Sequence, residues 1–326
     1  MMENNEYLRI IYGDGTLGIN GSNFHYIFNY NRGGLESLVI DQKEWLYQEP
    51  LPTFWRATTD NDRGNDFSKK SIQWLGADQF INIKDIAIQI DDKNIPLPLP
   101  PLNNKYSNNE QAQTAKIIFT YQTLTIPATY VKVSYKILTN GIIDVNVHYY
   151  GHSQLPELPA LGLRFVLSTP AIWYEYEGLS GETYPDRMAG AKEGTYKIQG
   201  LPVTPYLVPQ DCGVHMQTRR VTIARNTVNN NTLNNLEPFY LSISNFKHPF
   251  AFSCLPYTAE ELENATHQEE LPPIHHTVLT ILGAVRGVGG IDSWGSDVES
   301  NYHIDATKDI EFSFQIAGRK DNKINS

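Results

Sequence analysis

The feature that most constrains this chain is an alternation of apolar and polar residues with a period of two. It is clearest in two neighbouring segments, VKVSYKI at 131–137 and IDVNVHY at 143–149. Because successive side chains of a strand point to opposite faces, each segment has one apolar face and one polar face. The turn-forming pair Asn140-Gly141 lies between them, so the sequence predicts an antiparallel hairpin.

The same alternation recurs along the whole chain, whereas helix signals are few. Three further segments have it, at 86–90, 241–244 and 310–316. Thr258 and Glu261 have the spacing of a capping box, which predicts a short helix over 259–267, and a second short helix is predicted over 68–75. Many strands, scarce helices and no repeat of fixed period predict an all-β fold built as one large antiparallel sandwich.

Composition limits the classes of partner and compartment. Hydrophobic residues make up 40% of the 326 residues, enough for a sizeable core, and the formal net charge is -10. A net negative charge disfavours nucleic acid and anionic membrane surfaces as partners. Two cysteines, Cys212 and Cys254, are too few for a disulfide framework. No secretory leader and no membrane-spanning run is recognisable, so we expect a cytoplasmic protein.

The segment PTFWRATTDNDRGND at 52–66 combines Trp55 with two arginines and several carboxylates. It does not fit a calcium loop, because Gly64 occupies a position that needs an oxygen ligand and Ser71 stands where a bidentate Glu should close the site. The residues alone leave two interpretations open. Arg56 can pair with one of the aspartates to fix a turn, or the segment can contribute to a functional site.

Two more segments combine aromatic and polar residues. GAVRGVGGIDSWG at 283–295 surrounds Trp294 with glycines but does not have the pattern of a phosphate loop. Trp294 is therefore either a core aromatic beside a turn or an exposed ring on which the apolar face of a sugar can stack. For GETYPDR at 181–187, a buried network that supports a loop is the preferred interpretation. No usable nucleophile motif for hydrolysis is present.

Three segments, taken in order, resemble one family. They are FWRATTDNDRG at 54–64, ETYPDR at 182–187 and GVGGIDSWG at 287–295, and they are similar to the C-terminal domain of glycoside hydrolase family 2 β-galactosidases. In some lactic-acid bacteria this domain is a separate small subunit. The resemblance implies a galactose mutarotase-like supersandwich over 15–317, preceded by an N-terminal extension over 1–14 and followed by a C-terminal tail over 318–326.

The resemblance also implies that the complete enzyme consists of two chains with different roles. The two catalytic Glu residues of the family lie on a TIM barrel of about 250 residues, for which this sequence has no counterpart. A large partner subunit would supply them, together with Mg²⁺, and with Na⁺ as a second candidate ion. No catalytic residue, metal ligand or cofactor is expected in this chain.

Site roles are carried over by motif. Trp294 matches the family tryptophan that forms a sugar-stacking wall. The residues expected to shape the lip of the site are Arg56, Asp60, Asn61, Asp62 and Gly64. The residues expected to support it are Glu182, Tyr184, Asp186 and Arg187. The sequence departs from the family pattern at Thr58, where many members have proline, and in the stretch GLSG before Glu182.

The function implied is that of the small subunit of a heterodimeric β-galactosidase, which hydrolyses terminal β-D-galactosyl residues such as that of lactose. Two alternatives from other classes remain. A stand-alone aldose epimerase would need one His and one carboxylate in an open pocket, with His148 as the best candidate. A non-catalytic carbohydrate-binding module would need a row of exposed aromatic residues.

Overall fold

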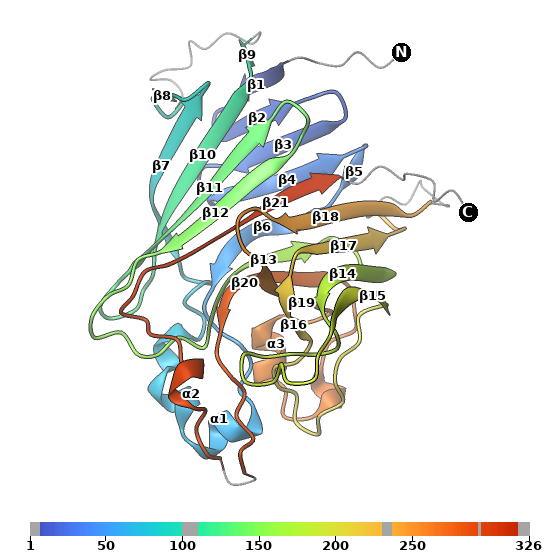
Figure 1. The fold of residues 1–326 in the computed structure, drawn as a ribbon. Coiled ribbons are helices and arrows are strands. Elements are labelled where there is room, and N and C mark those ends of the chain that lie inside the picture. Colours follow the sequence, from blue (N-terminus) through green and yellow to red (C-terminus); the bar gives the residue numbers. More distant parts are fainter. Residues whose placement is uncertain (1–6, 100–109, 230–236, 293–294, 319–326) are drawn as a thin grey trace.

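The computed structural model describes residues 7–99, 110–229, 237–292 and 295–318. Antiparallel strands in three sheets are the main secondary structure of these residues (Figure 1). The predicted all-β, antiparallel fold class is therefore confirmed.

The first sheet has six strands in the order β5-β4-β3-β2-β1-β9. Their bounds are β1 (Leu8–Tyr12), β2 (Thr16–Asn20), β3 (Phe24–Asn29), β4 (Gly34–Ile40), β5 (Lys43–Glu44) and β9 (Glu110–Ala112). Strand β1 lies before residue 15, within the segment expected to be an N-terminal extension. It pairs with both β2 and β9, and its residues Leu8 and Ile10 are fully buried in the core, so the sandwich already includes this part of the assigned extension.

The second sheet has ten strands in the order β15-β14-β17-β18-β21-β12-β11-β10-β7-β8. Their bounds are β7 (Asn82–Ile90), β8 (Lys93–Ile95), β10 (Thr114–Gln122), β11 (Tyr130–Leu138), β12 (Ile143–Tyr149), β14 (Trp173–Leu179), β15 (Glu193–Gln199), β17 (Arg220–Arg225), β18 (Phe239–Asn245) and β21 (Ile310–Gly318). The predicted hairpin is β11 and β12, with Val133 opposite Val147. The three other alternating segments lie in β7, β18 and β21, as predicted.

The third sheet has five strands in the order β16-β19-β20-β13-β6. Their bounds are β6 (Leu46–Thr53), β13 (Ala160–Leu167), β16 (Val214–Thr218), β19 (Phe250–Leu255) and β20 (Thr277–Val285). All eight residues of β13 are buried, because this strand is covered on both faces. A strand in that position loses the alternating pattern, which is why the sequence did not mark it.

The ten-stranded sheet packs against the other two sheets. On one side, Phe28 of β3 contacts Phe119 of β10 and Tyr135 of β11, with ring centroids 6.5 and 5.3 Å apart. On the other, Phe165 of β13 contacts Phe314 of β21 at 6.1 Å. One continuous apolar core thus fills the space between the sheets, which is the interior of a β-sandwich.

Three short helices and nearby loops lie together at the lower end of the molecule in Figure 1. The helices are α1 (Asp60–Gly64), α2 (Phe67–Lys70) and α3 (Ala259–Asn264), and 3₁₀ turns occur at Ile72–Trp74, Gln268–Glu270 and Ser300–Tyr302. Helix α3 begins with the predicted capping box of Thr258 and Glu261. We call this region the loop end and define it as residues 54–78, 156–157, 181–188, 210–211, 256–264, 286–292 and 295–304.

The single helix predicted over 68–75 is wrong in detail. It is divided into α2 and the 3₁₀ turn that follows, with Ser71 at the junction. The backbone N–H of Ser71 still donates to Phe67, but its hydroxyl donates to the carbonyl oxygen of Glu157 in a distant segment. The segment therefore follows tertiary contacts that its own sequence does not specify.

Candidate functional site

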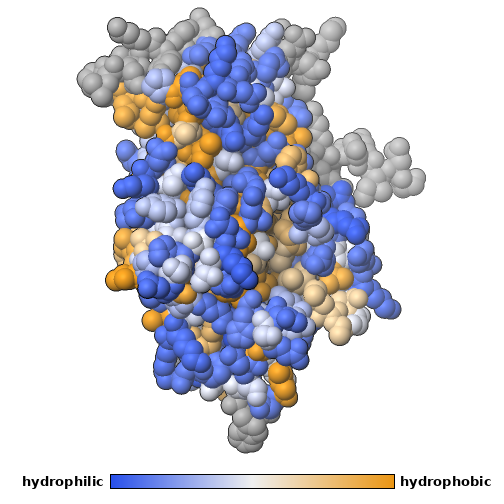
Figure 2. All heavy atoms as spheres, turned by 60° about the vertical axis from the view of Figure 1, so that its left-hand side comes forward, coloured by the Kyte–Doolittle hydropathy of each residue, from blue (hydrophilic) through white to orange (hydrophobic). Residues whose placement is uncertain are grey.

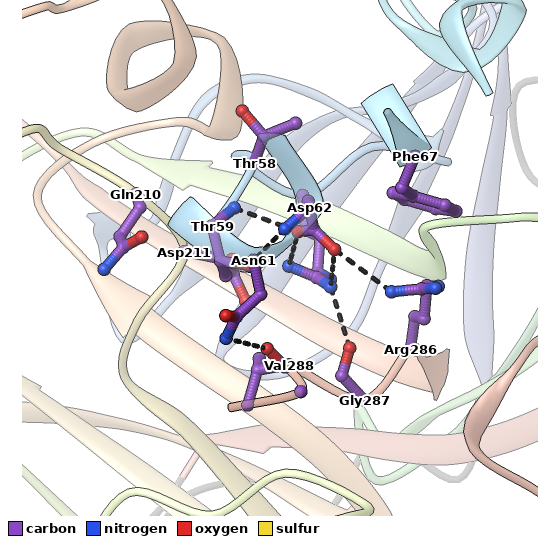
Figure 3. A network of polar contacts seen from close by, with 12 residues as sticks. Thr58, Thr59, Asn61, Asp62, Phe67, Gln210, Asp211, Arg286, Gly287 and Val288 are labelled. Carbon is purple, nitrogen blue, oxygen red and sulfur yellow. Dashed lines mark hydrogen bonds and ion pairs between the residues drawn. The ribbon is translucent and has the colours of Figure 1, made fainter. Parts of the chain in front are cut away.

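A buried carboxylate, that of Asp62, lies at the centre of the loop end (Figure 3). Arg56 binds it with two nitrogens, with Nη1 at 2.9 Å from Oδ2 and Nη2 at 3.2 Å from Oδ1. Arg286 binds it from the other side, with Nη1 at 3.0 Å from Oδ1. The predicted pairing of Arg56 with an aspartate is therefore present. Because all three groups are buried, each charge depends on the others for compensation.

Local sequence explains why Asp62 occupies this position. Thr59 is the N-cap of α1, and its hydroxyl accepts a hydrogen bond from the backbone N–H of Asp62. In return, the Asp62 carboxylate accepts from the backbone N–H of Thr59 at 2.9 Å. This capping box starts a helix of only five residues, and it holds the carboxylate between the two arginines. Asp60 and Arg63 instead form a partly exposed pair on the outside of α1.

Arg286 follows directly on β20 and joins several parts of the loop end. Its Nε donates to Glu157 Oε1 at 2.6 Å, and Nη2 donates to the carboxylate of Asp297. The guanidinium group lies 3.9 Å from the centre of the Phe67 ring of α2. Arg286 is thus surrounded by three carboxylates and one aromatic face, an arrangement that stabilises a buried cation.

The glycine-rich segment that begins after Arg286 is held through its backbone. The Gly287 carbonyl accepts from Arg56 Nη2 at 2.9 Å, and the Val288 carbonyl accepts from Asn61 Nδ2 at 3.0 Å. The backbone N–H groups of Val288 and Gly289 donate to the carboxylate of Asp186 at 3.0 and 2.8 Å. All three motifs therefore meet here, although they are far apart in the sequence.

Gly64 and Gly295 mark a close approach between the first and third motifs. Gly295 has φ of +85°, and a Cβ built on it would lie 2.6 Å from Gly64 Cα. Only glycine fits a position with both restrictions. Trp294 lies outside the described residues, so its sugar-stacking role stays a prediction.

Tyr184 and Asp211 form a second polar pair beside Arg56. The Tyr184 hydroxyl donates to Asp211 Oδ2 at 2.7 Å. Burial raises the pKa of the Asp211 carboxyl to about 6, and the nearby charge of Arg56 opposes this shift. The adjacent Gln210 accepts from the backbone N–H of Asp60, which links this pair to α1. Sequence reasoning missed Asp211, because it belongs to no motif and its partners come from other segments.

Glu263 of α3 is a second residue that sequence reasoning missed. Its carboxylate accepts from Trp55 Nε1 at 3.2 Å, from the Thr58 backbone N–H at 2.6 Å and from the Thr58 hydroxyl at 2.8 Å. Proline at position 58 could make neither of the last two bonds. The departure from the family pattern at Thr58 thus coincides with a side-chain anchor from α3.

The remaining supporting residues are more exposed. Glu182 is at the surface and accepts from the Thr204 hydroxyl at 2.8 Å. Arg187 is also exposed, and its Nη1 lies 3.9 Å from Asp186 Oδ2. Within the second motif, the structure therefore buries Tyr184 and leaves Glu182 and Arg187 in contact with solvent.

His148, the candidate for an epimerase, is not part of the loop end. It lies on β12, where its neighbours Val147 and Tyr149 are the residues that point into the core. Its Nε2 lies 3.0 Å from Asp309 Oδ2, and its ring stacks on Tyr150 with centroids 4.2 Å apart. The pair is partly exposed on the outer face of the ten-stranded sheet.

Within the described ranges, no group of three or more His, Cys, Asp or Glu side chains is placed to hold a metal ion. No helix in those ranges is long and apolar enough to cross a membrane.

Comparison with known proteins places the chain in a family. Residues 20–316 match the family described as beta galactosidase small chain. The chain is 60% identical to a β-galactosidase small subunit of Latilactobacillus sakei over 317 residues, covering 97% of this chain and 100% of the relative. It is 32% identical to a β-galactosidase of Halalkalibacterium halodurans, covering 95% of this chain but 28% of that protein. The chain belongs to the β-galactosidase small chain family.

Solved structures with a similar fold include a galactose mutarotase-like protein from Lactobacillus casei. The match covers 94% of this chain and 100% of that one, with a TM-score of 0.43 and 10% sequence identity. This likeness says nothing about activity.

Proposed function

We propose that this chain is the small subunit of a heterodimeric β-galactosidase that hydrolyses terminal β-D-galactosyl residues, lactose among its substrates. The observation that carries the proposal is the difference in length between two kinds of relative. The chain covers the whole of a small subunit from Latilactobacillus sakei but 28% and 27% of two longer β-galactosidases. A large subunit with a TIM barrel then supplies the remaining part, including both catalytic Glu residues and any bound Mg²⁺ or Na⁺.

The way the carboxylates of the loop end are bound supports a role in holding loops in position. Retaining glycosidases need two carboxyl groups about 5–5.5 Å apart, one of them free to attack and one to exchange a proton. Here the carboxylates of Asp62 and Asp297 are bound by arginines, and Asp186 accepts two backbone N–H groups. Groups engaged in this way keep loops in place. The loop end therefore shapes a sugar site and leaves bond cleavage to the partner.

Three residues would contact the sugar or border its site in this proposal. Trp294 would stack on the apolar face of the galactosyl ring, with Asn61 and Gly64 at the lip beside it. Asn61 and Gly64 are suited to this role because both lie against the glycine-rich segment that carries Trp294.

The direct test uses a chromogenic β-galactoside. Purified chain, purified large subunit and their mixture are assayed separately, and we expect full hydrolysis only in the mixture. Full-rate hydrolysis by this chain alone would overturn the proposal. In parallel, interconversion of α- and β-galactose is followed by polarimetry. Epimerisation by the chain alone, lost in His148→Ala, would favour the aldose epimerase instead.

The sugar-stacking role is tested with Trp294→Ala in the assembled enzyme. Loss of a stacking face is expected to cost about 1–2 kcal/mol, or roughly tenfold or somewhat more in kcat/KM. Thermal unfolding and association with the large subunit should stay near native. Unchanged lactose kinetics would remove this role while leaving the family assignment intact. A combined loss of stability and association would instead make Trp294 a core anchor.

We also place the enzyme in the cytoplasm. Cys212 and Cys254 are both buried free thiols, and burial raises the pKa of each well above its ordinary value. Such thiols stay protonated and unpaired, which suits a reducing compartment. Fractionation of cells with an antibody against this chain would test the assignment.

A further inference from the structure

Five large apolar side chains are exposed on two segments next to α2. They are Ile72 (53% exposed), Leu75 (38%), Phe80 (66%), Leu124 (59%) and Ile126 (82%). We call these five residues the apolar patch. Single exposed apolar residues are common on any surface, but a group of them on adjoining segments marks a place where another surface binds.

The two segments of the patch are joined directly. The backbone N–H of Ile126 donates to Gln73 Oε1 at 2.7 Å, and Gln73 lies between Ile72 and Leu75 in the sequence. The Phe80 ring approaches the backbone at Gly76, where a Cβ would lie 3.9 Å from it. In Figure 2, apolar side chains reach the surface among polar ones on the face that comes forward from the left of Figure 1.

The patch lies on the outer side of the same segment whose inner side builds the site. Ser71 and Trp74 donate to the carbonyl oxygens of Glu157 and Pro156 at 2.8 and 3.0 Å. Glu157 in turn binds Arg286, and Phe67 packs under the Arg286 guanidinium group. A protein that covers the patch would therefore contact the loop end, to which Ile72 and Leu75 belong.

We infer that the apolar patch is a docking surface for the large subunit. This inference rests on the proposed function, which requires the partner to bring its catalytic carboxylates to the loop end. The lengths of the relatives argue for the same occupant. A chain of this type fills 28% of a single-chain β-galactosidase, so the larger remainder of that protein has to be accommodated against its surface. Interfaces between permanent partners are large, above about 2,000 Å², and have apolar cores.

The residues around the apolar patch are those expected at the edge of a protein interface. Lys69 and Lys70 are exposed at the end of α2, and Lys69 pairs with Asp66 at 2.6 Å. Polar side chains around an apolar centre are the usual arrangement at a protein interface, and the central apolar residues contribute most of the affinity.

The test measures binding of the full chain to the purified large subunit by isothermal titration calorimetry. The double variant Leu124→Asp/Ile126→Asp and the single variant Phe80→Asp place charges on the patch. Leu207→Asp is the matched control, because Leu207 is 86% exposed and lies outside the two patch segments. We expect at least a 100-fold weaker Kd for the double variant, about 10-fold or more for Phe80→Asp, and less than a 3-fold change for the control. All variants should unfold at the wild-type temperature.

Activity gives a second readout that a folding defect cannot imitate. Because the patch does not touch substrate, a large excess of the double variant should restore the wild-type kcat of the large subunit. Binding of both patch variants within 3-fold of wild type would overturn the inference, and so would a kcat that stays low at saturation. If wild-type chain itself fails to bind the large subunit, the proposed function fails instead. A wild-type chain that is dimeric alone, and monomeric as the double variant, would show that a second copy covers the patch.

Discussion

The sandwich and the loop end are held together by different interactions. In the sandwich, strands β10, β11 and β12 present apolar residues at every second position to a core that includes fully buried Ile117 and Val133. In the loop end, the buried groups include charged ones, and Asp62 and Arg286 form an ion pair between segments 224 residues apart. The sandwich is stabilised by apolar burial, and the loop end depends on matching charges.

This difference predicts how each region responds to mutation. An apolar core loses stability in proportion to the volume removed and keeps its arrangement. A buried ion network loses much more when one partner is removed, because the remaining charge has no compensation.

Arg286→Met should cost about 3–5 kcal/mol in the free energy of unfolding. The variant leaves Asp297 without its arginine, leaves Glu157 with His303 alone, and deprives Asp62 of one of its two arginines. Chemical denaturation measures the change. The control is Arg219→Met, which removes an exposed pair with Glu193 and should cost less than about 1 kcal/mol. A loss for Arg286→Met no larger than that of the control would show that the network contributes little.

Lowering the pH should change the stability contributions of two buried groups in opposite directions, and one of these groups lies in each region. In the sandwich, burial lowers the pKa of His215 to about 4. Unfolded chains therefore bind a proton between about pH 6.5 and 4 that the native state does not, so this group's contribution is lost as the pH falls. The expected size is on the order of 2–3 kcal/mol. Stability measured against pH should be flatter in His215→Gln, and an unchanged slope would contradict the assignment.

At the loop end, the pKa of Asp211 is raised to about 6. Here the native state binds a proton that the unfolded chain does not bind until about pH 3.8, so this group adds stability as the pH falls from 6 to 4. Asp211→Asn should remove that gain, on the order of 2 kcal/mol, and make the acid side of the profile steeper. If Asp211→Asn and His215→Gln change the slope of unfolding free energy against pH in the same direction, the predicted contrast between the two groups is wrong.

Glu263→Ala should destabilise the chain by about 1–3 kcal/mol, because it leaves buried donors of Trp55 and Thr58 without an acceptor. Thermal unfolding measures the loss. Glu269→Ala, which removes an exposed carboxylate near the same helix, is the matched control and should be close to neutral. Equal effects of the two variants would mean that α3 does not anchor the first motif.

Ile117→Val should have the smallest effect, about 0.5–1.5 kcal/mol. Ile117 is fully buried on β10 between the sheets, and the change removes one methylene group without altering any charge. Urea denaturation should show a lower midpoint with an unchanged m-value, and galactosidase activity of the assembled enzyme should not change. Lys116→Ala on the outer face of β10 is the control. A loss of more than about 3 kcal/mol in the free energy of unfolding would contradict the expected difference, because the apolar core would then be as sensitive to mutation as the buried ion network.

How much the sequence could predict also differs between the two regions. A strand with one solvent-facing side shows an alternating pattern in consecutive residues, so the hairpin of β11 and β12 was predictable from the sequence. Strand β13 was not, because burial on both faces removes the alternation. In the loop end, Arg56 and Asp62 are six residues apart, and pairing of Arg56 with one of the nearby aspartates was one of the two interpretations left open.

The longer connections of the loop end were beyond local patterns. Arg286 binds Asp62 across 224 residues and Glu157 across 129 residues, and Glu263 reaches Thr58 across 205. No spacing rule indicates such pairs, because they depend on how the finished sandwich brings loops together. Arg56, Asn61 and Asp186 join the three motifs and are among the residues that the resemblance indicated, whereas Arg286 and Glu263 are not.

The central claim is that the loop end is one charge-coupled unit that positions the loops of a sugar site. A double-mutant cycle on Asp62→Asn and Arg286→Met tests it most directly, with the free energy of unfolding and the KM for a β-galactoside measured in the assembled enzyme. We predict that the two stability losses are non-additive by about 1–3 kcal/mol and that each single variant raises KM. Losses that add within about 0.5 kcal/mol, with KM unchanged in both single variants, would contradict the account.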